Sequence, residues 1–328
     1  IVESGMVEHI DAGEGRVTVT LRFEKARDPF AVKIKRQVEE AIARELSLDR
    51  EHVAVIVREA APKAAPAASQ HTFTGGIGKV LAVASGKGGV GKSSVTVNTA
   101  AALAHKGYKV GILDVDIHGP SVPNLLGLTS TVEMDETTHA LLPAAYDENL
   151  AVISMDTLLQ DKDQAVLWRG PKKTAAIRQF ISDVQWGELD FLLIDSPPGT
   201  GDEHMTVLQS IPDALCVVVT TPQEISLADV RKALDFLKVV KADVLGLVEN
   251  MSGLFCPHCG EEIDLFKKGG GEALAKQEGL TFLGAIPLDP ATVVAADRGH
   301  PIVSMPADTP AKAAFLKLAE TVREATQA

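Results

Sequence analysis

The sequence predicts an α/β protein with a mainly parallel sheet, preceded by a small α+β domain. Two observations lead to this prediction. From residue 79 onward, short apolar runs alternate with stretches of helical spacing, which is typical of a parallel sheet covered by helices on both faces. Before residue 59, the strand-like runs alternate apolar and polar residues, which indicates a sheet with one solvated face.

The small domain is expected to span residues 1–58. GRVTVTLRF (15–23) and HVAVIV (52–57) alternate as half-buried strands do, and KIKRQVEEAIARELS (33–47) between them has helical spacing. Residues 59–78 are rich in Ala, Pro, Gly and Ser and show no apolar period. We therefore interpret them as a linker.

The second domain, residues 79–328, contains the elements of the parallel sheet. Helical spacing is found in SSVTVNTAAALAHKG and SLADVRKALDFLKVV. The C-terminal segment PAKAAFLKLAETVREATQA is amphipathic without being strongly basic, so we expect it to pack on the sheet. The predicted strands are KVLAVAS (79–85), KVGILDVD (109–116), DFLLIDS (190–196), ALCVVVTT (214–221) and DVLGLVEN (243–250).

Composition limits the partners of the chain. Its 328 residues carry a net charge of -12, which argues against binding to nucleic acid or to anionic membranes, since both require clustered Lys and Arg. No apolar run approaches the roughly 18 residues of a membrane span. We therefore expect a cytoplasmic protein with no nucleic-acid and no membrane partner. Three cysteines, two of them in one CxxC, suit a reducing compartment and a metal or redox site.

A glycine-rich loop follows the first strand of the second domain. Gly86, Gly91, Lys92 and Ser93 match the pattern GxxxxGK(S/T) between a strand and a helix. Glycines let backbone N–H groups turn toward phosphate oxygens, and the following helix directs the positive end of its dipole at them. Lys92 would neutralise the β and γ oxygens of a nucleotide, and Ser93 would bind Mg²⁺. The residues expected to bind the nucleotide are Gly86, Lys87, Gly88, Gly89, Val90, Gly91, Lys92, Ser93 and Ser94.

Acidic residues end two further strands, as magnesium chemistry requires. Asp195 ends FLLID and is expected to hold Mg²⁺ through water. The turn at residues 197–199 is placed to sense a γ-phosphate. Asp114 and Asp116 end another strand in LDVDIHGPS, and solvation of a strand end is the alternative interpretation for either of them. His118 in the same segment is more typical of a switch loop than of a catalyst.

Cys256 and Cys259, in CPHCG, are the candidate metal ligands. A tetrahedral zinc or a four-iron cluster requires four ligands. One chain offers only this pair, because Cys216 lies inside an apolar strand and is expected in the core. Two chains related by a twofold axis would supply four thiolates. His258, between the two cysteines, is expected to point away from the metal.

GKGGVGKSS resembles the deviant Walker A motif of the P-loop NTPase family that contains the nitrogenase iron protein and the partitioning and Min-type ATPases. The resemblance implies that Lys87 reaches across a dimer to the partner's nucleotide. There it would couple ATP binding to dimer closure and stabilise the transition state as an arginine finger does. The resemblance also implies that Asp116 orients the attacking water. Lys87, Lys92 and Asp116 are therefore the expected catalytic residues.

Further segments narrow the resemblance. VASGKGGVGKSS, LDVDIHGPS, LLIDSPPGTGDEH, VENMSGLFCPHCG and GAIPLDP together resemble the Mrp or ApbC type of iron-sulfur cluster carrier ATPase over residues 78–326. This implies an ATP-binding homodimer with slow ATP hydrolysis. It would receive a labile 4Fe-4S cluster from a donor, hold it between its CxxC motifs and transfer it to apo iron-sulfur proteins. The alternatives are a zinc-stapled ATPase switch and a positioning ATPase that binds surfaces or DNA, both without a cluster.

The same resemblance implies walls for an adenine pocket, namely Asn250 after its strand and the IPLDP loop with Pro287 and Asp289. The guanine-specific pattern is absent because Val240, rather than Asn or Thr, precedes Lys241. ATP is therefore expected in preference to GTP.

The first domain is similar to the small iron-sulfur assembly domain that is often fused ahead of this ATPase, through IVESGMVEHI and the order strand, strand, helix, strand. It lacks the first helix of that domain at Ile1, and ARDPF around Asp28 has no cysteine. A docking or scaffolding role is therefore expected for it.

Overall fold

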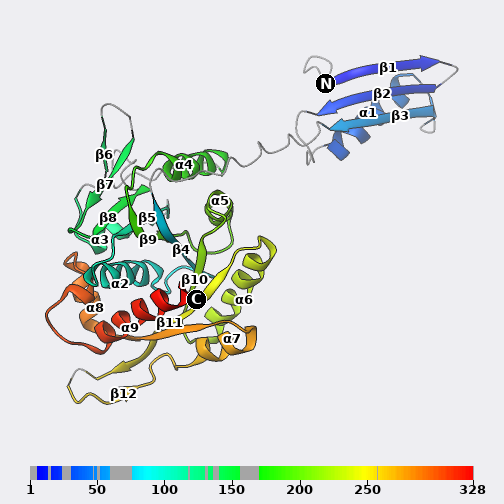
Figure 1. Cartoon of the computed structure of the whole chain (residues 1–328). Coiled ribbons are helices and arrows are strands. Elements are labelled where there is room, and N and C mark those ends of the chain that lie inside the picture. The colour runs from blue at the N-terminus through cyan, green and yellow to red at the C-terminus, as the bar shows by residue number, and fades with distance from the viewer. Residues whose placement is uncertain are drawn as a thin grey trace. The chain divides into compact units, whose positions relative to one another are not determined.

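The computed structural model describes residues 6–13, 16–23, 31–46, 48–49, 52–59, 76–116, 119–129, 132–135, 140–155, 170–256 and 258–327. The chain divides into two compact units, residues 1–69 and 70–328. Each unit has its own sheet (Figure 1). Each also has its own buried hydrophobic residues. Ile1, the ARDPF segment, His118 and most of the predicted linker lie outside the described residues.

The smaller unit folds in the order that the resemblance implies: β1 (Val7–Gly13), β2 (Arg16–Phe23), α1 (Ala31–Glu45) and β3 (Val53–Glu59). β2 pairs antiparallel with β1 and parallel with β3. One face of this sheet packs against the helix. The buried strand residues are Val17, Val19, Leu21 and Val55, and the helix residues packed on them are Ile34, Val38 and Ile42. The helix covers one face of the sheet, which explains the alternating strand pattern.

The larger unit contains the remaining elements. Its described strands are β4 (Ile77–Ser85), β5 (Val110–Asp114), β6 (Val132–Met134), β7 (Leu141–Ala145), β8 (Leu150–Ser154), β9 (Leu189–Asp195), β10 (Leu215–Thr220), β11 (Val244–Phe255), β12 (Glu262–Ile263) and β13 (Phe282–Leu288). Its described α-helices are α2 (Lys92–His105), α3 (Val122–Leu125), α4 (Gly170–Asp183), α5 (Asp202–Ser210), α6 (Glu224–Val239), α7 (Gly270–Glu278), α8 (Pro290–Asp297) and α9 (Pro310–Ala325).

These strands form one sheet in the order β12-β11-β10-β4-β9-β5-β8-β7-β6, with β13 also beside β11. The neighbouring strands in the series β13, β11, β10, β4, β9, β5 and β8 all pair parallel. Toward the edges, β12 pairs antiparallel with β11, β7 with β8, and β6 with β7. The prediction of a mainly parallel sheet is therefore confirmed. β6, β7, β8, β12 and β13 all fall outside the predicted strands. β6 and β12 have three residues or fewer and so give too little pattern, and the glycine and proline of β13 are typical of a loop.

Helices cover both faces of the large sheet (Figure 1). Successive residues of a strand point to opposite faces. Leu81 and Val83 of β4 accordingly belong to one core with α2 and α9, and Ala82 belongs to the other with α4, α5, α6 and α7. The C-terminal helix α9 packs on β13 and α2, as its amphipathic pattern predicts.

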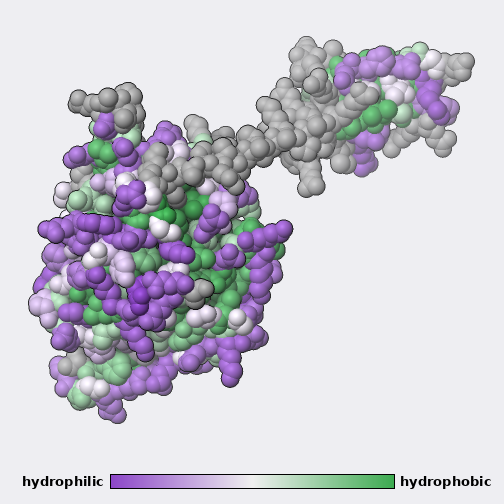
Figure 2. Space-filling view, viewed as in Figure 1, coloured by the Kyte–Doolittle hydropathy of each residue, from purple (hydrophilic) through white to green (hydrophobic). Residues whose placement is uncertain are grey.

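Hydrophilic residues cover much of the visible surface, and hydrophobic atoms reach it near the β12 hairpin at the bottom of the larger unit (Figure 2). The exposed large hydrophobic residues of this hairpin region are Phe255, Ile263, Leu265 and Phe266. Within the described residues, no helix is both long enough and apolar enough to cross a membrane.

The carboxyl ends of β4, β9 and β5 meet at one edge of the sheet. Val83 and Asp114 both pair with Asp195 across the neighbouring strands. The phosphate loop that follows β4 and the acidic strand ends therefore lie together, at the edge where open parallel sheets bind their ligands.

Candidate functional site

The loop between β4 and α2 has the backbone of a phosphate cradle. Gly89 and Gly91 both adopt φ +81°, in the left-handed region that glycine enters without steric cost. Gly86 has a different constraint, because a Cβ there would lie 2.4 Å from the backbone of Asp229 in α6. The fold of the loop therefore requires glycine at all three positions.

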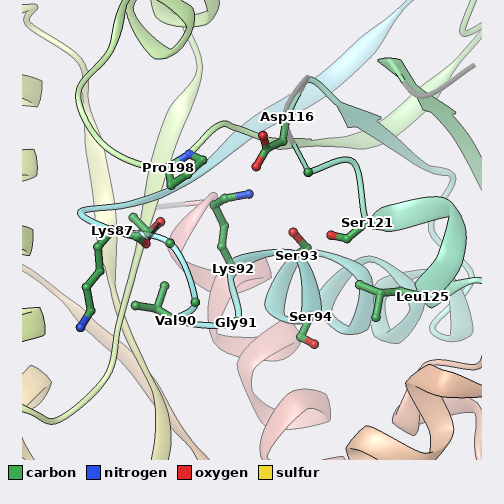
Figure 3. A pocket seen from close by; sticks show the side chains of 14 residues that line it. Lys87, Val90, Gly91, Lys92, Ser93, Ser94, Asp116, Ser121, Leu125 and Pro198 are labelled. Atoms are coloured by element: carbon green, nitrogen blue, oxygen red, sulfur yellow. Dashed lines mark hydrogen bonds between the residues drawn. The ribbon is translucent and has the colours of Figure 1, made fainter. Parts of the chain in front are cut away.

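This loop lines a cavity of about 320 Å³ (Figure 3). In it the amino group of Lys92 faces the carboxylate of Asp116, and the hydroxyl groups of Ser93 and Ser121 point to the same space. The predicted nucleotide-binding residues that line this cavity are Lys87, Gly88, Gly89, Val90, Gly91, Lys92, Ser93 and Ser94. The predicted residues that do not line it are Gly86, Asn250, Pro287 and Asp289.

Lys92 is held by a buried carboxylate. Its Nζ donates to Asp195 Oδ1 at 2.7 Å, and Ser93 Oγ donates to Asp195 Oδ2 at 2.6 Å. The side chains of Lys92 and Asp195 are both buried, so each charge depends on the other to offset the cost of desolvation. If a bound phosphate draws Lys92 away, the buried charge of Asp195 needs another cation to balance it.

The same oxygens fit Mg²⁺. The hydroxyl of Ser93 and the carboxylate of Asp195 are hard ligands of the kind that this ion prefers, and they already meet in one place. Within the described residues, no group of three or more His, Cys, Asp and Glu side chains could hold a metal ion. Ser93 and Asp195 would supply two of the oxygen ligands of Mg²⁺, and phosphate oxygens of a nucleotide would supply others.

The two acids at the carboxyl end of β5, Asp114 in the strand and Asp116 just after it, have different roles. Asp114 is fully buried, so the alternative of a solvated strand end is wrong for it. Its carboxylate accepts from the N–H groups of Asp116 (3.1 Å) and Val122 (3.3 Å) and from Ser154 Oγ (3.1 Å). Burial, and then the charge of Asp195, raise the pKa of Asp114 well above its usual range. Asp114 thus ties Asp116 and Val122, the first residue of α3, to the end of β5, and Asp116 lines the cavity.

Lys87 points away from the cavity that its own backbone lines (Figure 3). Its amino group lies on the other side of the loop from that of Lys92. Ser85 Oγ donates to the Lys87 carbonyl at 3.0 Å, which helps to fix the start of the loop. In this position the Lys87 ammonium does not reach phosphates bound in its own cavity. Pro198, from the predicted sensing turn, lines the same cavity.

Sequence patterns miss two further residues at this site. Thr96 Oγ1 lies 3.0 Å from Asp195 Oδ1 and 3.1 Å from the Lys92 carbonyl; its position one helical turn after Lys92 is the signal that could have found it. His204 in α5 is buried, and its Nδ1 has no hydrogen-bond partner. Burial, and then the charge of Lys92, lower the pKa of His204 to about 4, so its imidazole is neutral near pH 7.

The cysteine pair follows β11 in a tight turn. The Cys256 N–H donates to the Glu261 carbonyl, and the Gly260 N–H donates to the Cys256 carbonyl, both at 2.9 Å. Gly260 adopts φ +74°, which closes the turn. Cys256 is half-buried and Cys259 is exposed, so both thiols are accessible to a ligand.

The third cysteine lies in a different environment. Cys216 in β10 is fully buried, and burial raises the pKa of its thiol to about 12. The prediction that Cys216 belongs to the core is therefore confirmed. His258, between the two accessible cysteines, is exposed.

We expect Cys256 to be the first thiol alkylated in metal-free protein. The backbone N–H groups of Cys259 and then His258 donate to its sulfur and lower the pKa of Cys256, because they stabilise the thiolate. At pH 7, limiting iodoacetamide should therefore label Cys256 faster than Cys259, as measured by peptide mass spectrometry. Protein unfolded in urea should lose this preference; the same preference in unfolded protein would contradict the assignment to the turn.

A second cavity, of about 410 Å³, adjoins the cysteine turn and is lined by Cys256 and Asp289 among others. The expected IPLDP loop is wrong in its conformation, because Pro287 and Leu288 belong to β13. Asp289 caps α8, where its Oδ1 accepts from the Ala291 N–H at 2.8 Å. The structure thus brings Asp289 close to the cysteines rather than into the phosphate cavity.

Asn250 lies within β11 and not after it, because the strand continues to Phe255. Its Nδ2 donates to the Val90 carbonyl in the phosphate loop at 2.8 Å. The structure therefore brings Asn250 to the loop, although Asn250 does not line the cavity.

Comparison with known proteins places these features among relatives. A family model described as NUBPL iron-transfer P-loop NTPase matches residues 76–323. An iron-sulfur cluster carrier protein of Methanococcus maripaludis is 51% identical over 245 residues, which cover 74% of this chain and 84% of that protein. The cytosolic Fe-S cluster assembly factor NUBP2 of Homo sapiens is 45% identical over 267 residues, which cover 80% of this chain and 98% of that protein.

Solved structures show the same fold. A nucleotide-binding protein of Archaeoglobus fulgidus in complex with ADP is 41% identical, with a TM-score of 0.61 over 70% of this chain and 90% of that chain. The cell division ATPase MinD of Pyrococcus furiosus is 26% identical, with a TM-score of 0.57 over 75% of this chain and 99% of that chain.

Proposed function

The chain belongs to the NUBPL iron-transfer family of P-loop NTPases, and on that premise we propose that it is an iron-sulfur cluster carrier controlled by ATP. A homodimer receives a labile 4Fe-4S cluster from a donor, holds it between its two CxxC motifs and transfers it to apo iron-sulfur proteins. The cluster is the cargo of the protein, whereas the nucleotide controls its release.

The observation that carries this proposal is an accessible thiol pair just beyond the strand that contacts the phosphate loop. β11 contacts the loop through Asn250 and ends just before Cys256. A positioning switch would need the phosphate cavity but not the thiols. One chain supplies two of the four thiolates that a four-iron cluster requires, so the cluster site is complete only in a symmetric dimer.

Nucleotide binding acts first on Lys92. Lys92 and the N–H groups of the loop bind the phosphates of ATP, and Lys92 then leaves Asp195. Ser93 and Asp195 hold Mg²⁺, which neutralises phosphate oxygens when it is bound. Asp116, at the edge of the cavity, orients the attacking water for slow hydrolysis.

Two features support a homodimer. Lys87 extends away from its own cavity (Figure 3), where it is available to the nucleotide of a partner subunit. The hairpin that bears the cysteines exposes Phe255, Ile263 and Leu265, and exposed apolar groups around a half-complete site favour burial against a second copy.

The smaller unit is proposed as a docking domain. Residues 1–58 contain no cysteine, since the chain has three and all lie beyond residue 200. Cluster chemistry is therefore assigned to residues 79–328. The linker expected at residues 59–78 is shorter at both ends, because Glu59 belongs to β3 and β4 begins at Ile77.

Lys92→Ala is expected to weaken ATP binding by roughly 100-fold, because it removes charge-assisted hydrogen bonds to the phosphates. Isothermal titration calorimetry with Mg-ATP measures this loss. Lys79→Ala, an exposed lysine in the first half of the same strand β4, is the matched control and should keep the parental affinity. Parental affinity in a folded Lys92→Ala protein would contradict the role of Lys92.

The proposed function is tested by anaerobic reconstitution with iron and sulfide, followed by visible and EPR spectra and an iron count. We expect about four irons per dimer and a faster transfer to an apo acceptor in one nucleotide state than in the other. Zinc that stays bound in the presence of excess iron and sulfide would instead indicate the zinc-stapled switch and overturn the carrier proposal. Equal release rates with and without ATP would overturn control by the nucleotide.

A further inference from the structure

Beyond Asn250, strand β11 bulges away from its neighbour β13. Asn250 and Leu254 pair with residues of β13 that are only two positions apart, so the bulge holds two extra residues. Within it Met251 (φ +59°) and Gly253 (φ +73°) both adopt the left-handed conformation. This conformation is costly for a residue with a side chain, so it persists only where the surroundings hold it in place.

Glu249, which lies one residue before Asn250, is a fully buried carboxylate that accepts three hydrogen bonds. Its Oε1 accepts from Ser252 Oγ at 2.6 Å and from the Gly269 N–H at 2.8 Å, and its Oε2 accepts from the Gly271 N–H. The segment that carries the cysteines, here called the cysteine hairpin, begins at Ser252 and ends at Gly269, where α7 starts. One side chain therefore ties both ends of the cysteine hairpin to the sheet and satisfies N–H groups at the start of α7.

Asn250, the next residue, contacts the phosphate loop instead. Its Nδ2 donates to the Val90 carbonyl at 2.8 Å, and it lies so close to the loop that a Cβ on Gly91 would be 2.2 Å from it. A trans peptide directs its C=O and the following N–H to opposite sides. Asn250 thus turns the Gly91 N–H away from itself, and Gly91 lines the phosphate cavity.

We propose that Glu249 and Asn250 are positioning residues that transmit nucleotide occupancy of the phosphate loop to the cysteine hairpin. This inference rests on the proposed function for its purpose, whereas its contacts are independent of any cluster. Successive residues of a strand point in opposite directions. A single peptide unit therefore joins Asn250, which contacts the phosphate loop, to Glu249, which contacts both ends of the cysteine hairpin. A phosphate that binds the Gly91 N–H fixes the Val90–Gly91 peptide, strengthens the contact to Asn250 and restrains Glu249.

The test measures thiol accessibility in the full-length chain, reduced and free of metal. The rates at which N-ethylmaleimide alkylates Cys256 and Cys259 are compared without nucleotide and at saturating Mg-ADP. We expect Mg-ADP to slow alkylation by about tenfold in the parent, which is within the usual range of coupling between two sites. In Glu249→Gln and in Asn250→Ala, the ratio of the alkylation rate without nucleotide to the rate with Mg-ADP should fall to near one.

Each variant removes contacts of one side chain. Glu249→Gln keeps the shape but replaces one acceptor oxygen by an NH₂ group, so at least one of the three donors to Glu249 loses its acceptor. Asn250→Ala removes the donor to Val90. If Glu249→Gln does not fold, Ser252→Ala removes a single hydrogen bond from the same carboxylate and should lower the ratio partly.

The matched control is Glu262→Gln on the same hairpin, which loses a surface ion pair with Lys268 and should keep the parental ratio. A parental ratio near one, or a tenfold ratio that survives in both Asn250→Ala and the Glu249 or Ser252 variant, overturns the proposal. The iron content of reconstituted parent is measured separately. Nucleotide-dependent alkylation without cluster loading would overturn the carrier function and support the coupling. Cluster loading with a ratio near one would support the carrier function and overturn the coupling.

Discussion

A protein in which Cys256 and Cys259 are both replaced by serine is expected to lose its iron-sulfur cluster completely and to keep its fold. The loss should be complete because each subunit contributes these two thiolates, so the double variant removes every sulfur ligand from a bridging site. The fold should survive because Cys259 is exposed and Cys256 is half-buried, so neither side chain contributes much to a hydrophobic core. The measurement is the iron and sulfide content after anaerobic reconstitution, together with the visible absorption of the cluster.

The matched control for this variant is Cys216→Ala. Cys216 is fully buried among the apolar core residues around β10, so its removal should cost some stability and leave the iron content unchanged. Mg-ATP binding should also remain at the parental level in the Cys256→Ser, Cys259→Ser protein. A double variant that still binds about four irons per dimer would show that the cluster lies elsewhere and would remove the basis of the carrier assignment.

The phosphate loop could be predicted from the sequence because its geometry is local. Left-handed backbone at Gly89 and Gly91 strongly favours glycine, and a lysine and a serine at the following helix start give the loop its chemistry. Asp195 could be predicted as well, since an acid at the end of a parallel strand must lie at the same edge as the loop. The parallel sheet follows from strands that are apolar throughout.

The contacts between distant segments could not be predicted in this way. Asn250 lies 160 residues from Val90, and no pattern in either segment indicates that the two meet. The three hydrogen bonds to Glu249 depend on a bulge in β11, and the sequence of a strand does not show a bulge. Asp114 is predictable as an acid at a strand end, but its contacts with Val122 and Ser154 come from residues that the pattern of this strand does not indicate.

Lys87→Ala is expected to leave the nucleotide affinity of a single chain within about threefold of the parent, as for other solvent-facing charges. In contrast, ATP turnover by the dimer should fall by about 1,000-fold, which is the lower end of the effect of an arginine finger. The reason is geometric: the amino group points away from its own cavity (Figure 3), so it contributes to catalysis only at a nucleotide held by another subunit. Calorimetry and a phosphate-release assay measure the two quantities separately.

Mixing two inactive variants distinguishes action across the dimer from action within one chain. A Lys87→Ala dimer binds nucleotide but lacks the lysine that would act on the partner's nucleotide. A Lys92→Ala dimer keeps Lys87 but binds nucleotide poorly. In a mixed dimer, the Lys87→Ala subunit binds ATP and receives Lys87 from its partner, so one of the two sites is complete. Because half of the dimers are mixed after equal mixing, about a quarter of the parental turnover should return. If no turnover returns although mixed dimers form, Lys87 does not act on the partner's nucleotide, and the dimeric mechanism proposed for this chain is wrong.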